Sequence, residues 1–261
     1  MFSRIKFPLV VSFAALFVSA CATTPAGRKQ VLLVGEGQMA EMGDASFNEL
    51  KKKQVTSSDP EENRKVKCVT TALLKAMGEN PSEWEIKVFK DPTPNAFALP
   101  GKNVGVHTGM MSLVANQDQL AAVIGHEIGH VLAHHGNERV SQGMLTQAGL
   151  QVADAVLGKN SKNDKYLMAA LGMGAQVGIL LPFSRKQETE ADRLGLEYMA
   201  KAGFDPRQAP ELWKLMKAKG GGGGPEFLST HPSSDSRIAD LSERAPGLMP
   251  AYESSQKAHC F

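Results

Sequence analysis

The sequence predicts a mainly helical α+β domain with one small β-sheet early in the chain. Two observations support this fold class. Short segments with alternating apolar residues, bounded by proline and glycine, lie between residues 84 and 106, as is typical of strands. From residue 117 onward, apolar residues recur at helical spacing and turn residues separate the segments. The hydrophobic fraction of 42% and the charged fraction of 21% are ordinary for a globular chain of 261 residues.

The first twenty residues have the pattern of a secretion signal. Arg4 and Lys6 precede an apolar run at residues 7–17, and small residues then lead to Cys21. The run is too short for a membrane span. This order resembles the lipobox of bacterial lipoproteins, which implies cleavage before Cys21 and its lipidation, although an ordinary secretory signal with a chance cysteine is the alternative. Because Ala22 resembles a signal for outer-membrane sorting, we expect an outer-membrane lipoprotein that faces the bacterial periplasm.

The expected domain boundaries follow from this signal. Residues 1–20 are the signal peptide, residues 21–36 a lipid-anchored tether, and residues 37–261 the folded domain. Losing the signal reduces the 29 lysines and arginines to 27, which equals the 27 aspartates and glutamates. A neutral chain without a nucleic-acid motif is not expected to bind nucleic acid.

Two cysteines remain in the folded domain, Cys68 and Cys260. In an oxidising compartment they could pair and join the C-terminus to an early helix. The alternative is two unrelated thiols, because sequence alone does not show their proximity.

Secondary structure is expected in a simple order along the domain. Strands are expected at residues 84–89, 95–99 and 104–106, and the flanking prolines make 95–99 typical of an edge strand or of an extended segment bounded by turns. Five consecutive glycines at 220–224 indicate a flexible loop. Helices are expected at 37–53, 61–77, 117–135, 138–157, 165–181, 186–202, 208–219 and 233–244.

A pair of histidines four residues apart is the first sign of a metal site in the sequence. His126 and His130 lie in the helix expected at 117–135, and residues i and i+4 share one face of a helix. Glu127 lies beside them and can reach a water on a metal ion. A catalytic zinc needs three protein ligands and one open position, so a third ligand must follow later in the chain. The alternative is a surface helix whose histidines are satisfied by other partners.

Two more histidines follow in the same helix. His134 continues the stripe, but it lies about 12 Å along the helix axis from His126 and cannot share its ion. We therefore interpret His134 and His135 as residues of the helix end, or at most as neighbours of the ligands.

Glu188 and Asp192 are the candidates that complete the site. They are i and i+4 in the helix expected at 186–202, so both can face a metal. Alone, this acidic segment would be interpreted as a solvated helix face. However, HExxH followed some sixty residues later by ExxAD resembles the gluzincin family of HtpX, the CAAX prenyl protease and the periplasmic BepA-type proteases. The resemblance implies a zincin-like metallopeptidase domain, one Zn²⁺ per chain, Glu188 as third ligand, and Asp192 as support for the first histidine.

Two further segments extend this resemblance over about residues 60–245. Residues 91–101 resemble the family's edge strand, which implies that extended substrates pair with its backbone; a purely structural strand is the alternative. The predicted substrate-binding residues are Asn95, Ala96, Phe97 and Ala98. His231 and Arg237 resemble a family element whose histidine or arginine stabilises the oxyanion, and whose histidine caps the metal in some BepA-like members. The alternative is a loop that leads into a helix.

The expected function is zinc-dependent hydrolysis of peptide bonds in misfolded or envelope proteins, with Glu127 as general base. The expected partners are protein or peptide substrates and, through the N-terminal lipid, the membrane. One alternative is a factor for outer-membrane protein assembly or quality control that works with the assembly machinery and has little turnover. A protein that stores zinc is another. Residues 166–183 contain three glycines and a glutamine and are expected to form a helix that is buried or covers a groove rather than one that spans a membrane.

Overall fold

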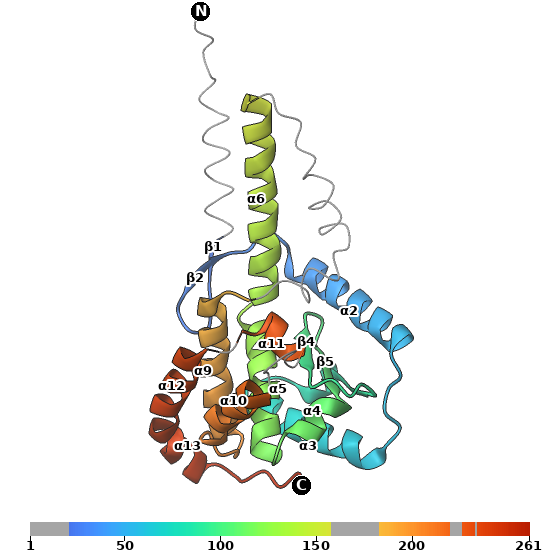
Figure 1. Cartoon of the computed structure of the whole chain (residues 1–261), viewed down its shortest axis with the longest axis vertical. Helices are drawn as coiled ribbons and strands as arrows, with labels where there is room; N and C mark the ends of the chain where they lie inside the picture. The colour runs from blue at the N-terminus through green and yellow to red at the C-terminus, as the bar shows by residue number, and fades with distance from the viewer. Residues whose placement is uncertain (1–20, 158–182, 220–225, 233) are drawn as a thin grey trace, which may run out of the picture.

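The computed structural model describes residues 21–157, 183–219, 226–232 and 234–261. Helices dominate these residues and a small sheet packs against one side of them, so the mainly helical α+β fold is confirmed (Figure 1). The signal peptide expected at 1–20, the helix expected at 165–181 and the loop expected at 220–224 lie outside the described residues. Within the described part of the chain, no helix combines the length and the apolar character that a membrane crossing needs.

The sheet has three strands, β3 (Glu85–Phe89), β4 (Ala96–Leu99) and β5 (Asn103–His107). Their order is β3-β5-β4; β5 is parallel to β3 and antiparallel to β4, which forms one edge. The expected edge strand is thus an edge strand in the structure. The ring of Phe97 packs over Gly105. A Cβ atom on residue 105 would lie 2.2 Å from this ring, so the position needs glycine. The sheet packs on helices that precede and follow it in the chain, namely α2 (Glu36–Lys53), α3 (Pro60–Ala76), α4 (Thr108–Leu113) and α5 (Gln117–Leu132).

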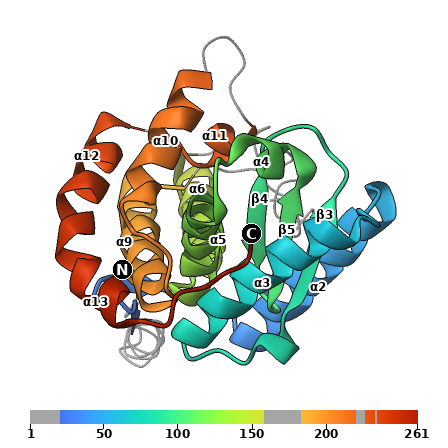
Figure 2. The ribbon, with the colours of Figure 1, turned by 90° about the horizontal axis from the view of Figure 1, so that it is seen from below.

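Two helices at the centre of the molecule, α5 (Gln117–Leu132) and α9 (Arg185–Lys201), pack along their length (Figure 2). The contact uses small residues. A Cβ atom on Gly195 would lie 2.8 Å from the backbone nitrogen of His126, and a Cβ atom on Gly129 would lie 3.2 Å from the carbonyl oxygen of Ala191. The absence of side chains at these positions lets the two backbones approach closely.

The later helices surround this pair. The α10 helix packs on α5, and α12 and α13 pack on α9 (Figure 2). The later elements are α10 (Gln208–Lys219), α11 (Glu226–Thr230), α12 (Asp235–Arg244), the short 3-10 helix Ala245–Leu248 and α13 (Met249–Ser254). Another 3-10 turn, Pro81–Glu83, precedes β3.

Two predicted helix boundaries, on either side of His134, are wrong. The helix expected at 117–135 ends at Leu132, because His134 adopts a left-handed backbone conformation with φ of 55°. A new helix, α6 (His135–Leu157), then begins three residues before the expected start and extends away from the body of the molecule (Figure 1). His135 is therefore at the beginning of a helix and not at the end of one.

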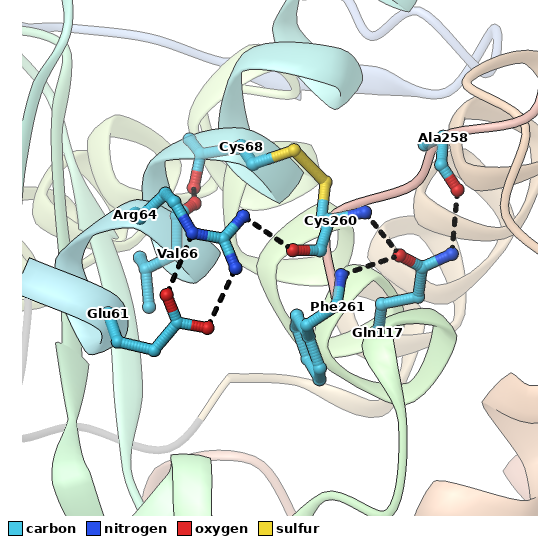
Figure 3. The surroundings of a disulfide bond; sticks show 9 residues. Glu61, Arg64, Val66, Cys68, Gln117, Ala258, Cys260 and Phe261 are labelled. Carbon is cyan, nitrogen blue, oxygen red and sulfur yellow. Dashed lines mark hydrogen bonds and ion pairs between the residues drawn. A yellow bond between two sulfur atoms is a disulfide. The ribbon is translucent and has the colours of Figure 1, made fainter.

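The segment expected to be a tether contains two short strands, β1 (Cys21–Thr23) and β2 (Lys29–Val31), which pair as an antiparallel hairpin. At the other end of the chain, a disulfide joins Cys68 of α3 to Cys260 (Figure 3). The side-chain oxygen of Gln117 accepts the backbone N–H of Cys260 at 2.7 Å, which holds the C-terminal segment against the start of α5.

Candidate metal centre

The centre begins on α5, where His126, Glu127 and His130 are all buried. The helix starts at Asn116, whose side chain accepts the N–H of Gln119. The Nε2 atoms of His126 and His130 lie 3.1 Å apart, so the i, i+4 spacing brings the two imidazoles to one point as expected.

Glu188 reaches this point from α9. The helix begins with a capping box in which Ser184 accepts the N–H of Gln187, so Glu188 lies in the first turn. One carboxylate oxygen of Glu188 lies 3.4 Å from Nε2 of His130, and the other lies 3.6 Å from Nε2 of His126. The two helices thus bring together the three residues that the sequence predicts as ligands.

His231 joins the same cluster from the loop after α11. Its Nδ1 lies 3.2 Å from Nε2 of His126 and 3.0 Å from the Glu188 carboxylate. The rings of Phe227 and Phe183 stack on His231, with centroid distances of 4.4 Å and 5.0 Å. Sequence reasoning placed His231 near the oxyanion or as a cap, and the structure places it among the ligand atoms.

The four side chains fit a zinc ion. One atom from each of His126, His130, Glu188 and His231 lies within 4.8 Å of every other. Imidazole nitrogens and a carboxylate oxygen that are buried together are the donor atoms that zinc binds in proteins. In a tetrahedral zinc site with bonds of about 2.0 Å, the ligand atoms would lie roughly 3.3 Å apart, close to the separations seen here.

Asp192 supports the first histidine. Its Oδ1 lies 2.9 Å from Nδ1 of His126, which leaves Nε2 of that ring for the cluster. Arg237 donates two hydrogen bonds to the same carboxylate, at 2.7 Å and 2.8 Å, and its Nη1 lies 2.5 Å from Glu188. Its guanidinium also stacks over Trp213 at 4.0 Å. Arg237 therefore holds the carboxylates of the site in place, and its expected role at the oxyanion stays a prediction.

Burial governs the charge states at the site. Burial raises the pKa of the Glu127 carboxyl, which favours a group that can accept and release a proton. Burial also raises the pKa of Asp192, but the positive charge and hydrogen bonds of Arg237 outweigh it and leave that pKa below its usual value.

The predicted substrate-binding strand lies beside Glu127. The backbone N–H of Ala98 hydrogen-bonds to the Glu127 carboxylate and lowers its pKa in part. The carbonyl oxygen of Asn95 accepts the N–H of His107 at 2.9 Å, Ala96 is buried, and the ring of Phe97 packs on other rings of the sheet. Ala96 and Phe97 thus pack within the fold, and pairing of a substrate with the backbone of this strand stays a prediction.

A cavity of about 450 Å³ adjoins the end of this strand and His130. Its lining is mainly apolar and includes Met39, Trp84, Leu99 and Phe183. A cavity of this kind beside the metal centre can accept an apolar side chain.

The sequence left His135 as a residue of the helix end or, at most, a neighbour of the ligands, and the structure places it beside His130. It is fully buried, and its Nδ1 lies 2.9 Å from Nδ1 of His130. Burial lowers the pKa of His135 to about 4. The helix break after Leu132 brings about this contact, since the turn at His134 directs the side chain of His135 back towards α5. The sequence analysis did not predict this break.

Comparisons with known proteins add to this geometry. A family model described as peptidase family M48 matches residues 60–245. The mitochondrial metalloendopeptidase OMA1 of Schizosaccharomyces pombe is 38% identical over 196 residues, which cover 74% of this chain and 56% of the relative. Metalloendopeptidase OMA1 of Danio rerio is 34% identical over 242 residues, covering 84% and 49%.

A bacterial relative matches over nearly the whole chain. The β-barrel assembly-enhancing protease of Escherichia coli (strain K12) is 27% identical over 273 residues, which cover 98% of this chain and 56% of the relative. The chain spans about half the length of the curated relatives it matches.

Proposed function

This chain belongs to peptidase family M48, and we propose on that premise that it is a zinc-dependent endopeptidase. The convergence of His126, His130 and Glu188 from two helices, with Glu127 beside them, is the observation that carries the proposal. Structural zinc sites are usually closed by four cysteine or histidine ligands, so a carboxylate in the set favours catalysis.

The residues at the cluster have different roles in the proposed hydrolysis. Zinc held by His126, His130 and Glu188 would supply Lewis acidity, polarising the scissile carbonyl and acidifying a water. Glu127 takes the proton from the attacking water and then delivers it to the leaving amine. The raised pKa of its carboxyl suits both transfers, since a general base must also return its proton.

The substrate would lie extended along the free edge of β4. Antiparallel addition of a peptide to this edge places its backbone next to Ala98, whose own N–H already contacts Glu127. The cavity beside His130 would take an apolar side chain of the bound segment. This arrangement favours unfolded protein segments as substrates, because a folded chain has few free backbone groups.

His231 closes the site in the state described here. Its Nδ1 lies among the ligand atoms, and its Nε2 lies 3.4 Å from Glu127, where an attacking water would approach. We propose that this is a resting state and that the loop carrying His231 moves when substrate binds. The same closure supports the second candidate function, an assembly or quality-control factor with little turnover.

The cellular setting is proposed from the sequence and one relative. The lipobox-like segment ending at Cys21 and the name of the Escherichia coli relative support an envelope lipoprotein that acts on misfolded or β-barrel proteins. The relatives named OMA1 are mitochondrial, so the comparisons alone support both compartments.

The decisive experiment compares purified wild-type protein with Glu127→Gln on unfolded casein, with and without a chelator. We expect chelator-sensitive cleavage by the wild type and at least a roughly hundred-fold slower rate in the variant, which should keep its zinc. Hydrolysis that persists in Glu127→Gln would reject the assigned base. Casein binding without any cleavage would support the assembly factor.

A further inference from the structure

A line of polar contacts leads from the metal cluster to the N-terminal hairpin. His135 contacts His130 through Nδ1, and its Nε2 lies 3.1 Å from a carboxylate oxygen of Glu190. The same oxygen accepts a hydrogen bond of 2.7 Å from Nε of Arg28, which directly precedes β2. Arg28 lies outside the region matched by the family, so the match does not account for this contact.

Arg28 also holds a second buried carboxylate. Its Nη1 and Nη2 donate to the two oxygens of Glu138 at 2.6 Å and 2.7 Å. Glu138 and Glu190 are each only 5% exposed. Burying two negative carboxylates so close together costs free energy unless a cation lies between them. The planar guanidinium of Arg28 supplies this cation and hydrogen-bonds to both carboxylates. The hairpin therefore supplies the counter-ion for a pair of acidic groups beside the metal centre.

The direction of the hydrogen bonds follows from the chemistry of each group. The ionised Glu190 can only accept, so Nε2 of His135 carries the proton. A neutral imidazole then has its lone pair on Nδ1, which accepts the Nδ1–H of His130. This leaves the lone pair of His130 on Nε2, the atom that faces the cluster.

The other histidine of α5 has an equivalent arrangement. His126 contacts the Asp192 carboxylate, which Arg237 holds with two hydrogen bonds. Each histidine is thus linked to a carboxylate that an arginine holds. His126 contacts its carboxylate directly, and His130 is linked to its carboxylate through His135. Partners of this kind set the tautomer and the orientation of a ligand.

We propose that His135 and Arg28 are positioning residues for the metal centre, so that the N-terminal hairpin orients His130 through Glu190 and His135. The inference rests on the proposed function only in requiring that the cluster binds zinc. It assigns to the segment before the folded domain a part in building the site.

The first test replaces His135 by two side chains of similar size. His135→Leu removes both hydrogen bonds, whereas His135→Gln can accept from His130 and donate to Glu190. Zinc affinity is measured by competition with a chelating dye. We expect about ten- to a hundred-fold weaker binding for His135→Leu and substantial recovery in His135→Gln. Equal affinity of the leucine variant and the wild type would overturn the proposal, as would an equal loss in both variants.

The second test removes the arginine at the far end. Arg28→Gln is compared with Arg193→Gln, a control that breaks an arginine–aspartate fork on α9 outside the metal centre. We expect weaker zinc binding and altered visible absorption of the cobalt-substituted protein in Arg28→Gln alone. Identical affinities and spectra for the two variants would contradict a role for the hairpin. If Arg28→Gln does not fold, the His135 pair decides.

These outcomes are distinct from failure of the proposed function. A wild-type protein that binds no zinc would refute the metal centre itself. Tight zinc binding that neither pair of variants changes would leave the peptidase proposal intact and reject the role of His135 and Arg28.

Discussion

His231 is the residue on which the state of the site depends. The sequence predicts its place near the metal through its resemblance to a family element, but not the distance of 3.2 Å between its Nδ1 and Nε2 of His126. That contact depends on the loop after α11, whose position is set by tertiary packing on Phe227 and Phe183.

Replacing His231 by alanine should show whether this residue caps the metal or stabilises the transition state. We expect His231→Ala to keep zinc and to cleave unfolded casein several-fold faster, because the position that His231 fills becomes free. His259→Ala is a matched control, since His259 is an exposed histidine of the C-terminal segment that the disulfide of Cys260 holds. A large fall in turnover of His231→Ala at unchanged zinc content would assign His231 to the stabilisation of the transition state instead.

Single-residue predictions from the sequence succeeded where local spacing determines geometry. The i, i+4 rule predicts that His126 and His130 share a face, as do Glu188 and Asp192, and the structure brings them together. It did not reveal the contact between His135 and His130, because that contact depends on the backbone conformation of His134.

At the scale of elements, the close packing of α5 on α9 delivers the carboxylates to the histidines. The sequence predicts both helices, but the distance between them follows from glycines whose partners lie about seventy residues away in the chain. Periodicity identifies the face of a helix and says little about how near its neighbour lies.

A side chain at Gly195 should disturb both the fold and the metal centre. Gly195→Val places atoms against the backbone of His126, so we expect a loss of about 1–3 kcal/mol in the free energy of unfolding. Zinc affinity should fall as well, since α9 carries Glu188. Urea unfolding and chelator competition measure the two effects.

Gly37→Ala in α2 is the control for this substitution, because nothing lies within 4 Å of a Cβ atom there. It should leave zinc affinity unchanged and stability equal or higher. If Gly195→Val is as stable as the wild type and binds zinc equally well, the close contact between the helices is unnecessary for the site.

In the whole molecule, the two ends of the part that the structure describes are held to the body by different means. The N-terminal hairpin is held by ion pairs of Arg28, and the C-terminal segment by the disulfide of Cys260 with Cys68 (Figure 3). The sequence identified both cysteines but left their pairing open, since proximity across 192 residues is a property of the fold.

Removing this disulfide should lower stability without removing the metal. For a loop of this length we expect the double variant Cys68→Ser/Cys260→Ser to lose about 2–5 kcal/mol in the free energy of unfolding. A reducing agent should shift wild-type protein to the same stability and leave the variant unchanged. An unfolding curve of the wild type that is insensitive to reductant would argue against the bond.

In the proposed site, two imidazoles of α5 and the carboxylate of α9 hold one zinc ion. A crystal structure of the zinc-loaded protein, with anomalous scattering recorded at the zinc edge, would show the ion and its ligands. We predict a single strong peak bonded to Nε2 of His126, Nε2 of His130 and the Glu188 carboxylate. A zinc peak elsewhere, or one at the histidines with Glu188 turned away, would contradict it.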